Sequence, residues 1–146
     1  FNLLMARANA TEDMMWEVLD HAGLREAVAS FPERLDHIVG DHGGMLSGGE
    51  RQRLLIAMAW LRNPRILLLD EITAALDAIT DRQIRASIGR LMEGRTTIIV
   101  SHRLENLVRA DKIYVLEGGQ ILAEGSHPSL LSSCSLYQQL WEARSF

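Results

Sequence analysis

The chain has 146 residues, of which 47% are hydrophobic and 23% charged, and its net charge at pH 7 is −4. This length suits one domain or part of one, with enough apolar side chains to bury a core. The net charge excludes the strong positive field that holds nucleic acid or an anionic membrane nonspecifically, so we expect no nucleic-acid partner. The apolar runs LLIAMAW and ILLLD are far shorter than the roughly 18 to 20 residues that span a bilayer.

The start of the chain and its single cysteine give further expectations. The start, FNLLMARANA, has no basic leader before a sustained apolar region and is therefore not a secretory signal. It also does not begin with Met, and we expect the chain to be cut from something longer. Cys134 is the only cysteine, which fits a reducing compartment.

Helical patterns dominate the first 62 residues. Apolar side chains recur at helical spacing between residues 11 and 30, with Gly23 as a stop. Residues 31–45 carry proline and glycines without a period and indicate an ordered loop. A further helix is predicted from Gly48 to about Leu61, before Asn63 and a proline.

The second half of the chain predicts an α/β fold. RILLLD (65–70) and TTIIVS (96–101) are typical of strands covered on both faces in a parallel sheet. Residues 81–93 between them form one helix that ends at Gly94 and has a single apolar face, made of Ile84, Ile88, Leu91 and Met92. Strand, helix and strand predict a right-handed parallel crossover. KIYVLEGGQILAEG (112–125) then predicts a hairpin around two glycines, followed by two short helices.

The stretch SGGE (47–50) marks a helix start with an unusual composition. Ser47 and Glu50 have the spacing of a capping box, in which each side chain accepts from the other residue's backbone N–H. Glycines at the first two helical positions, Gly48 and Gly49, cost about 1 kcal/mol each relative to alanine. Helix amides left open to an oxyanion would explain them. The alternative is an ordinary glycine-rich helix start.

Acidic and imidazole groups follow the two predicted strands. Asp70 and Glu71 close the first strand, at the edge where open α/β sheets bind ligands. One carboxylate can hold Mg²⁺ through water, and the other can activate a water that attacks phosphorus. His102 follows the second strand, beside the same sheet edge, and could contact a terminal phosphate. The alternative for all three residues is an ordinary polar strand end.

Four motifs in this order resemble the nucleotide-binding domain of ATP-binding-cassette (ABC) transporters. LSGGERQR (46–53) resembles the signature motif, RILLLDE (65–71) the Walker B strand with its glutamate, AALD (74–77) the D-loop, and SHRL (101–104) the switch-histidine loop. VGDHG (39–43) resembles the loop before the signature in exporters, and the closing hairpin also matches them. The resemblance covers the whole chain as the C-terminal portion of that domain.

The resemblance implies a P-loop NTPase-like parallel sheet flanked by helices, present here as an incomplete domain. Residues 1–62 would be a helical subdomain with the signature loop and helix. Residues 63–146 would be the C-terminal part of the ATPase core, ending in a hairpin and helices.

The resemblance also implies roles for individual residues, with ATP and Mg²⁺ as cofactors. Asp70 would support Mg²⁺ through water, Glu71 would be the catalytic carboxylate and His102 would contact the γ-phosphate. Asp77 would link the two sites of a head-to-tail dimer. In that dimer the signature residues would contact ATP held by the partner: Ser47, Gly48, Gly49 and Glu50.

Two partners follow from the same resemblance. One is a second nucleotide-binding domain, in a homodimer or a heterodimer, and the other is the transmembrane domain of the transporter. The chain would then lie at the cytoplasmic face of the membrane, attached through that domain.

The sequence also departs from the family pattern. Glu50 stands where exporters usually have glutamine, Ala74 where serine is common, and Asp41 where glutamate is usual. No G-x-x-x-x-G-K-[ST] phosphate loop and no glutamine loop occur. GRLMEGRT (89–96) has the spacing but carries Arg95 for lysine and runs from helix into strand, the wrong order. We therefore expect the chain alone to bind ATP weakly and to hydrolyse it negligibly.

Other readings stay open or are rejected. A DNA-repair or chromosome-organising ATPase also combines a signature-like element with Walker B, but no coiled-coil heptads lead towards the signature here. A catalytically silent cassette is a further alternative. A metal site at His37, Asp41 and His42 is rejected because no third spaced imidazole or thiolate accompanies them.

Overall fold

The computed structural model describes residues 2–40, 43–71 and 78–143. Within them the chain forms two compact units, Phe1–Ile98 and Ile99–Phe146. The predicted division at residues 62 and 63 stays a prediction. Asp77, Asp41 and His42 lie outside the described residues.

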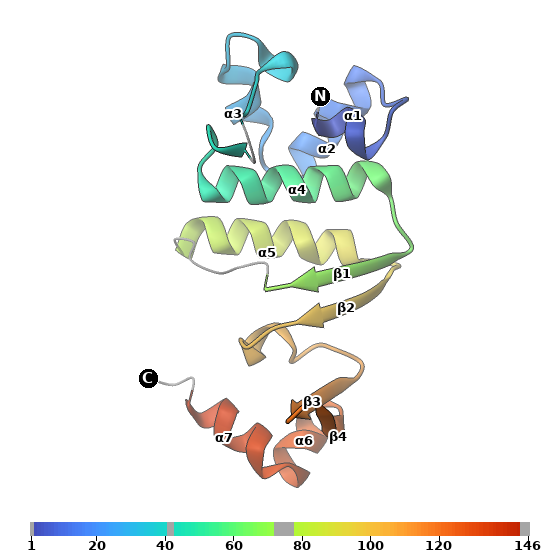
Figure 1. Cartoon of the computed structure of the whole chain (residues 1–146), viewed down its shortest axis with the longest axis vertical. Helices are drawn as coiled ribbons and strands as arrows, with labels where there is room; N and C mark the ends of the chain where they lie inside the picture. Colours follow the sequence, from blue (N-terminus) through green and yellow to red (C-terminus); the bar gives the residue numbers. More distant parts are fainter. Residues whose placement is uncertain (1, 41–42, 72–77, 144–146) are drawn as a thin grey trace. The chain divides into compact units, whose positions relative to one another are not determined.

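The first unit is built mainly of helices (Figure 1). Its elements in chain order are α1 (Asn2–Ala6), α2 (Glu12–His21), α3 (Arg25–Ser30), the 3₁₀ turn η1 (Arg34–Asp36), α4 (Gly48–Arg62), β1 (Ile66–Asp70), α5 (Ala78–Met92) and β2 (Thr96–Val100), whose last residues already belong to the second unit. The helices expected between residues 11 and 30 are confirmed as α2 and α3, with Thr11 as N-cap and Gly23 in a left-handed conformation at φ +68°. The predicted signature helix is confirmed as α4.

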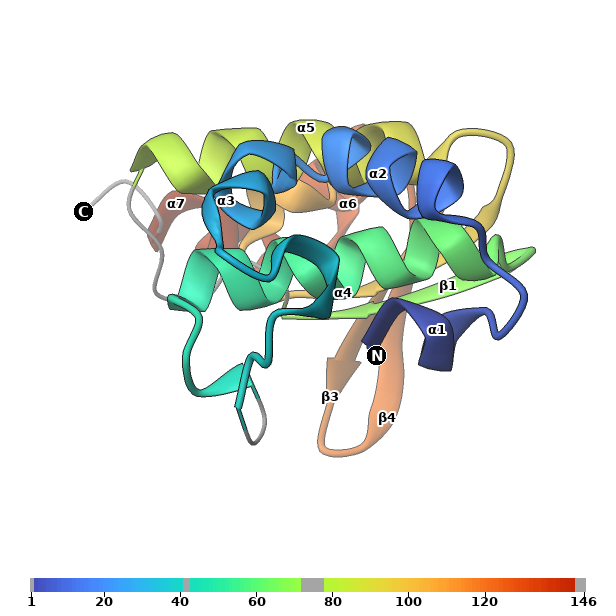
Figure 2. The ribbon, with the colours of Figure 1, turned by 90° about the horizontal axis from the view of Figure 1, so that it is seen from above.

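Helix α4 lies at the centre of the first unit, where α1, α2 and α5 contact it. Figures 1 and 2 show α4 and α5 side by side and running in the same direction. Each of these four helices contributes to one buried core, which includes Leu3 on α1, Leu19 on α2, Ala57 and Leu61 on α4, and Ile84 and Leu91 on α5. The face of α5 predicted to be apolar is thus confirmed, although α5 begins three residues earlier than expected.

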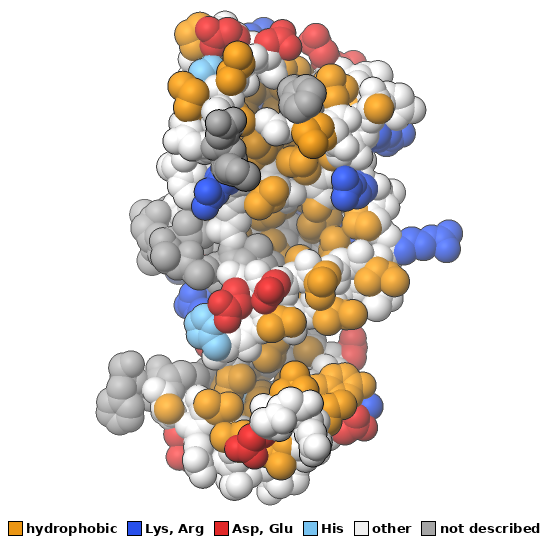
Figure 3. All heavy atoms as spheres, in the orientation of Figure 1, with side chains coloured by type: hydrophobic (Ala, Val, Ile, Leu, Met, Phe, Trp, Pro, Cys, Tyr) orange, Lys and Arg blue, Asp and Glu red, His pale blue; other side chains and the backbone are white. Residues whose placement is uncertain are grey.

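Strands β1 and β2 are neighbours in a parallel two-stranded sheet, joined through α5 as predicted. The prediction that both faces of these two strands are covered is wrong for the described residues. On β2, Ile98 is 54% exposed, and no residue of that strand is fully buried. Leu67 is 5% exposed, whereas Ile66 and Leu68 are 64% and 70% exposed. The strand alternates because the core packs against one face only. Figure 3 accordingly shows hydrophobic side chains at the surface.

The second unit contains a hairpin and two short helices, as predicted. After the 3₁₀ turn η3 (Leu104–Asn106), strands β3 (Ile113–Glu117) and β4 (Gln120–Gly125) pair antiparallel. Gly118 and Gly119 both have positive φ, at 57° and 78°, as a two-residue hairpin turn requires. Helices α6 (His127–Ser133) and α7 (Ser135–Ala143) follow. A separate core holds this unit together, formed by Leu104, Ile113, Val115, Leu130, Cys134 and Tyr137.

Candidate functional site

The predicted capping box at the start of α4 is confirmed. Ser47 is the N-cap, with φ −60° and ψ 159°. The Glu50 N–H donates to Ser47 Oγ at 3.3 Å, and the Ser47 N–H donates to Glu50 Oε2 at 2.8 Å. These two bonds fix the backbone of the signature segment where it enters the helix.

The side chains of Ser47 and Glu50 also bind each other directly. The Ser47 hydroxyl donates to Glu50 Oε2 at 2.6 Å. Hydrogen bonds from the Ser47 side chain and then from its backbone lower the pKa of Glu50 below its ordinary value of 4.5, and the nearby charge of Arg53 lowers it further. Glu50 is therefore a carboxylate at neutral pH, and it accepts the hydrogen bond that the Ser47 hydroxyl donates.

The two glycines of the signature have different surroundings. Gly48 is exposed, and a Cβ there would have no atom within 4 Å from the described residues beyond its own turn of helix. Gly49 is buried, and a Cβ there would lie 2.7 Å from Thr80 Cγ2 on α5. At Gly48 the absence of a side chain leaves the helix amides open to an approaching anion, as expected from the sequence. At Gly49 close helix packing requires the glycine, and no sequence signal indicated this because Thr80 is far along the chain.

Asp70 and Glu71 lie where the sequence placed them, at the carboxyl end of β1. Both side chains are exposed. Asp70 is the last strand residue, and Glu71 has a left-handed backbone at φ +43°, which turns the chain sharply out of the strand. A solvent-facing carboxylate such as Asp70 fits Mg²⁺ held through its water shell.

His102 lies in the second unit, two residues after β2, and its side chain is exposed. Its turn is organised by Ser101, whose Oγ accepts from the Arg103 N–H at 3.0 Å and from Asn106 Nδ2 at 3.2 Å. The expected proximity of His102 to Asp70 stays a prediction.

His37 has ordinary neighbours in the loop before α4. Its Nδ1 lies 2.8 Å from Glu33 Oε2, and its ring stacks on Phe31 with the centroids 4.0 Å apart. In the part of the chain that the structure describes, no three His, Cys, Asp or Glu side chains form a group that could hold a metal.

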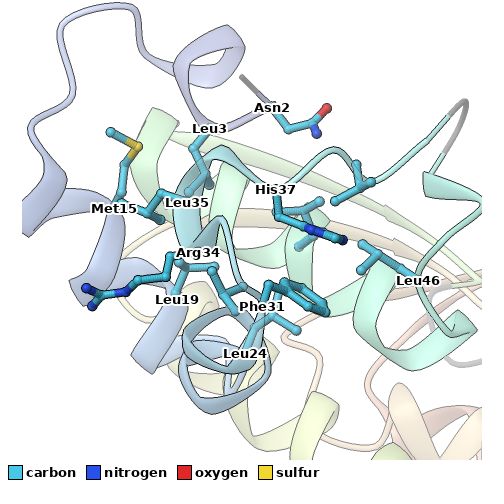
Figure 4. A pocket seen from close by; sticks show the side chains of 13 residues that line it. Asn2, Leu3, Met15, Leu19, Leu24, Phe31, Arg34, Leu35, His37 and Leu46 are labelled. Atoms are coloured by element: carbon cyan, nitrogen blue, oxygen red, sulfur yellow. The ribbon is translucent and has the colours of Figure 1, made fainter.

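A small, partly open pocket lies in the first unit (Figure 4). Its volume is about 50 Å³, and Leu3, Leu19, Phe31, His37 and Leu46 are among its lining residues. Because Leu46 directly precedes the Ser47 N-cap, this pocket borders the loop that leads into α4.

Comparison with known proteins agrees with the motifs. The family model described as "ABC transporter" matches residues 1–74. The ATP-dependent lipid A-core flippase of Burkholderia orbicola is 52% identical over 122 residues, which make up 84% of this chain and 21% of that protein. The multidrug resistance ABC transporter ATP-binding and permease protein of Lactococcus lactis subsp. cremoris is 46% identical over 129 residues, 88% of this chain and 22% of that protein.

Solved structures give the same result. The structure of a bacterial Atm1-family ABC exporter with ATP bound matches this fold with a TM-score of 0.87 and 36% identity, covering 99% of this chain and 25% of that chain. The chain spans about a fifth of the length of the two curated relatives. The fold is that of part of an ABC exporter nucleotide-binding domain. Because the family model matches 74 of the 146 residues, the chain belongs to the ABC transporter family.

Proposed function

We propose that this chain is part of the ATP-hydrolysing module that powers transport by an ABC exporter. The observation that carries the proposal is the start of α4, where the capping box holds Ser47 and leaves Ser47 and Gly48 exposed. The first-turn amides of a helix lack intrahelical acceptors and attract anions. A family member with this surface is suited to bind a nucleotide phosphate.

The signature residues act on ATP held by a second nucleotide-binding domain, in a head-to-tail dimer. The Gly48 and Gly49 amides donate to phosphate oxygens. Glu50 orients the Ser47 hydroxyl through the 2.6 Å hydrogen bond between their side chains. Hydrolysis therefore needs two domains, either identical or different.

The groups after the two strands carry the remaining chemistry. Asp70 holds Mg²⁺ through water, Glu71 orients and deprotonates the attacking water, and His102 donates to the γ-phosphate. Asp77 links the two sites of the dimer. Bound ATP with Mg²⁺ supplies the phosphoryl group and part of the charge neutralisation.

The second partner is a transmembrane domain, which places the chain at the cytoplasmic face of a membrane. The name of the Lactococcus relative combines an ATP-binding and a permease function in one protein. None of the helices in the described residues is long and apolar enough to cross a bilayer. These relatives favour the transporter hypothesis over a DNA-repair ATPase.

The 146 residues alone should bind ATP weakly and hydrolyse it negligibly. A phosphate loop and its lysine normally provide much of the contact with the β- and γ-phosphates, and the sequence has neither.

The test is the substitution Glu71→Gln in the full-length transporter. We expect ATP turnover to fall by about a thousandfold or more, because a general base is lost, while ATP binding is retained. Glu93→Gln, at an exposed acid just after α5, is the matched control and should leave turnover unchanged. Turnover that survives Glu71→Gln would contradict the proposed role.

A further inference from the structure

Helices α4 and α5 lie side by side and parallel, so that their N-terminal turns are neighbours (Figures 1 and 2). The signature residues occupy the first turn of α4. The predicted D-loop, residues 74–77, directly precedes α5 in the sequence. The contact between the two helices therefore connects the helix that begins with the signature residues to the helix that follows the predicted D-loop in the sequence.

The first part of this contact is the approach of Gly49 to Thr80. A Cβ added at Gly49 would lie 2.7 Å from Thr80 Cγ2, a distance that real side chains essentially never show. Only glycine lets the two helix backbones approach this closely at the present position of Thr80. Thr80 thus sets how deeply the first turn of α4 packs against α5.

The second part lies one helical turn further along both helices. Arg53 Nη1 donates to Gln83 Oε1 at 3.0 Å. The Arg53 Nε is buried and, among the described residues, has no hydrogen-bond partner, whereas the bond to Gln83 lies at the exposed edge of the contact between the helices. A Cβ added at Gly23, in the turn after α2, would lie 3.9 Å from Arg53 Cδ. The hydrogen bond to Gln83 links Arg53 on α4 to α5.

We propose that Thr80 and Gln83 are positioning residues for the signature segment. They touch Gly49 and Arg53, which follow Ser47 at spacings of two and six residues on α4. Through these contacts α5 fixes two properties of the first turn of α4, which carries the Ser47–Glu50 capping box. They are its distance from α5 and its rotation about the helix axis. The inference rests on the proposed function, because it assigns these contacts to the geometry of that same nucleotide site.

The main experiment is a rescue in the full-length transporter, read out as ATP turnover and as ATP-binding capacity per mole of protein. Gly49→Ala should lower kcat by roughly tenfold or more, because overpacking at such a contact is costly. Adding Thr80→Ser removes the methyl group that collides while keeping the hydroxyl. We expect this double variant to regain kcat to within about threefold of Thr80→Ser alone.

Two controls make the rescue specific. Gly49→Ala with Thr80→Val retains a γ-methyl group and should stay impaired relative to Thr80→Val alone. A Cβ at Gly48 would not lie within 4 Å of Thr80, so Thr80→Ser should not change the activity of Gly48→Ala. ATP-binding capacity should remain at the wild-type level in Thr80→Ser and Thr80→Val, which change no group proposed to contact ATP. A loss of folded protein would lower that capacity.

A second, independent variant set tests the polar contact. Gln83→Met keeps the side-chain length but removes the acceptor for Arg53, and should lower kcat about threefold. Gln83→Glu restores an acceptor and should return kcat to near the wild-type level, again with unchanged ATP-binding capacity.

The outcomes separate this inference from the proposed function. If wild-type protein shows no ATPase that is sensitive to Glu71→Gln, the proposed function fails. If it does show that activity, but Thr80→Ser does not rescue Gly49→Ala and Gln83→Met matches wild type, the positioning role is overturned and the function stands. If Gly49→Ala alone fails to fold, the Gln83 series decides the question.

Discussion

The helices of the first unit and its strand β1 use similar residues with opposite results. Leu19 on α2 is 1% exposed in the helical core, whereas Leu68 on β1 is 70% exposed. Helices α1, α2 and α5 contact α4, on which Ile56, Ala57 and Leu61 are buried, whereas β1 has β2 as its one strand neighbour and an open face in the described residues. Neighbouring helices of the same chain therefore bury Leu19. Folding of this chain removes little of the Leu68 side chain from water, so Leu68 contributes little to the free energy of folding.

The largest expected effect is the loss of a buried leucine. Leu19→Ala should lower the free energy of unfolding of the 146-residue chain by about 2 to 5 kcal/mol, because it leaves a cavity in the helical core. Leu68→Ala is the matched control and should change it by less than about 0.5 kcal/mol. Urea denaturation followed by circular dichroism measures both. Equal losses in the two variants would show that the outward face of β1 is covered and would remove the contrast.

The next largest effect concerns the start of α4. Ser47→Ala removes the side chain that accepts from the Glu50 N–H and should cost about 1 kcal/mol of stability. Ser126 is the N-cap of α6 but makes no side-chain capping bond, so Ser126→Ala should cost less. The same denaturation experiment compares the two variants. A smaller loss for Ser47→Ala than for Ser126→Ala would contradict the capping geometry.

The smallest effect is a pH dependence at Glu50. Hydrogen bonds from Ser47 lower the pKa of Glu50 in the folded chain below its ordinary value of 4.5. A lowered folded-state pKa stabilises the fold above the unfolded-state pKa, and this contribution disappears as pH falls through the folded-state value. Glu50→Gln should therefore flatten the loss of stability as the pH falls below the ordinary value of 4.5.

Denaturation midpoints of wild type and Glu50→Gln across that range measure this effect. Glu93→Gln, at an exposed acid after α5, serves as the control and should leave the wild-type slope unchanged. If the midpoints of wild type and Glu50→Gln fall in parallel with pH, Glu50 does not contribute to the pH dependence of stability.

The sequence by itself determined the features that depend on near neighbours. The S-x-x-E spacing predicted the capping box of Ser47 and Glu50, and adjacent glycines predicted the β3–β4 turn. The helical period predicted the buried face of α5. Asp70 and Glu71 were placed correctly at a strand end. In each case the deciding hydrogen bonds or side-chain directions involve residues only a few positions apart.

Only the tertiary structure decided what remote segments do to one another. It packs Gly49 against Thr80, pairs Arg53 with Gln83, and leaves one face of β1 open although the run RILLLD indicated burial on both sides. An apolar run indicates that its side chains favour burial. Whether each face of the strand is covered depends on which other element packs against that face. Likewise, a glycine in the sequence shows where another group can approach the backbone closely. The arrangement of α4 and α5 determines that this group is Thr80 at Gly49.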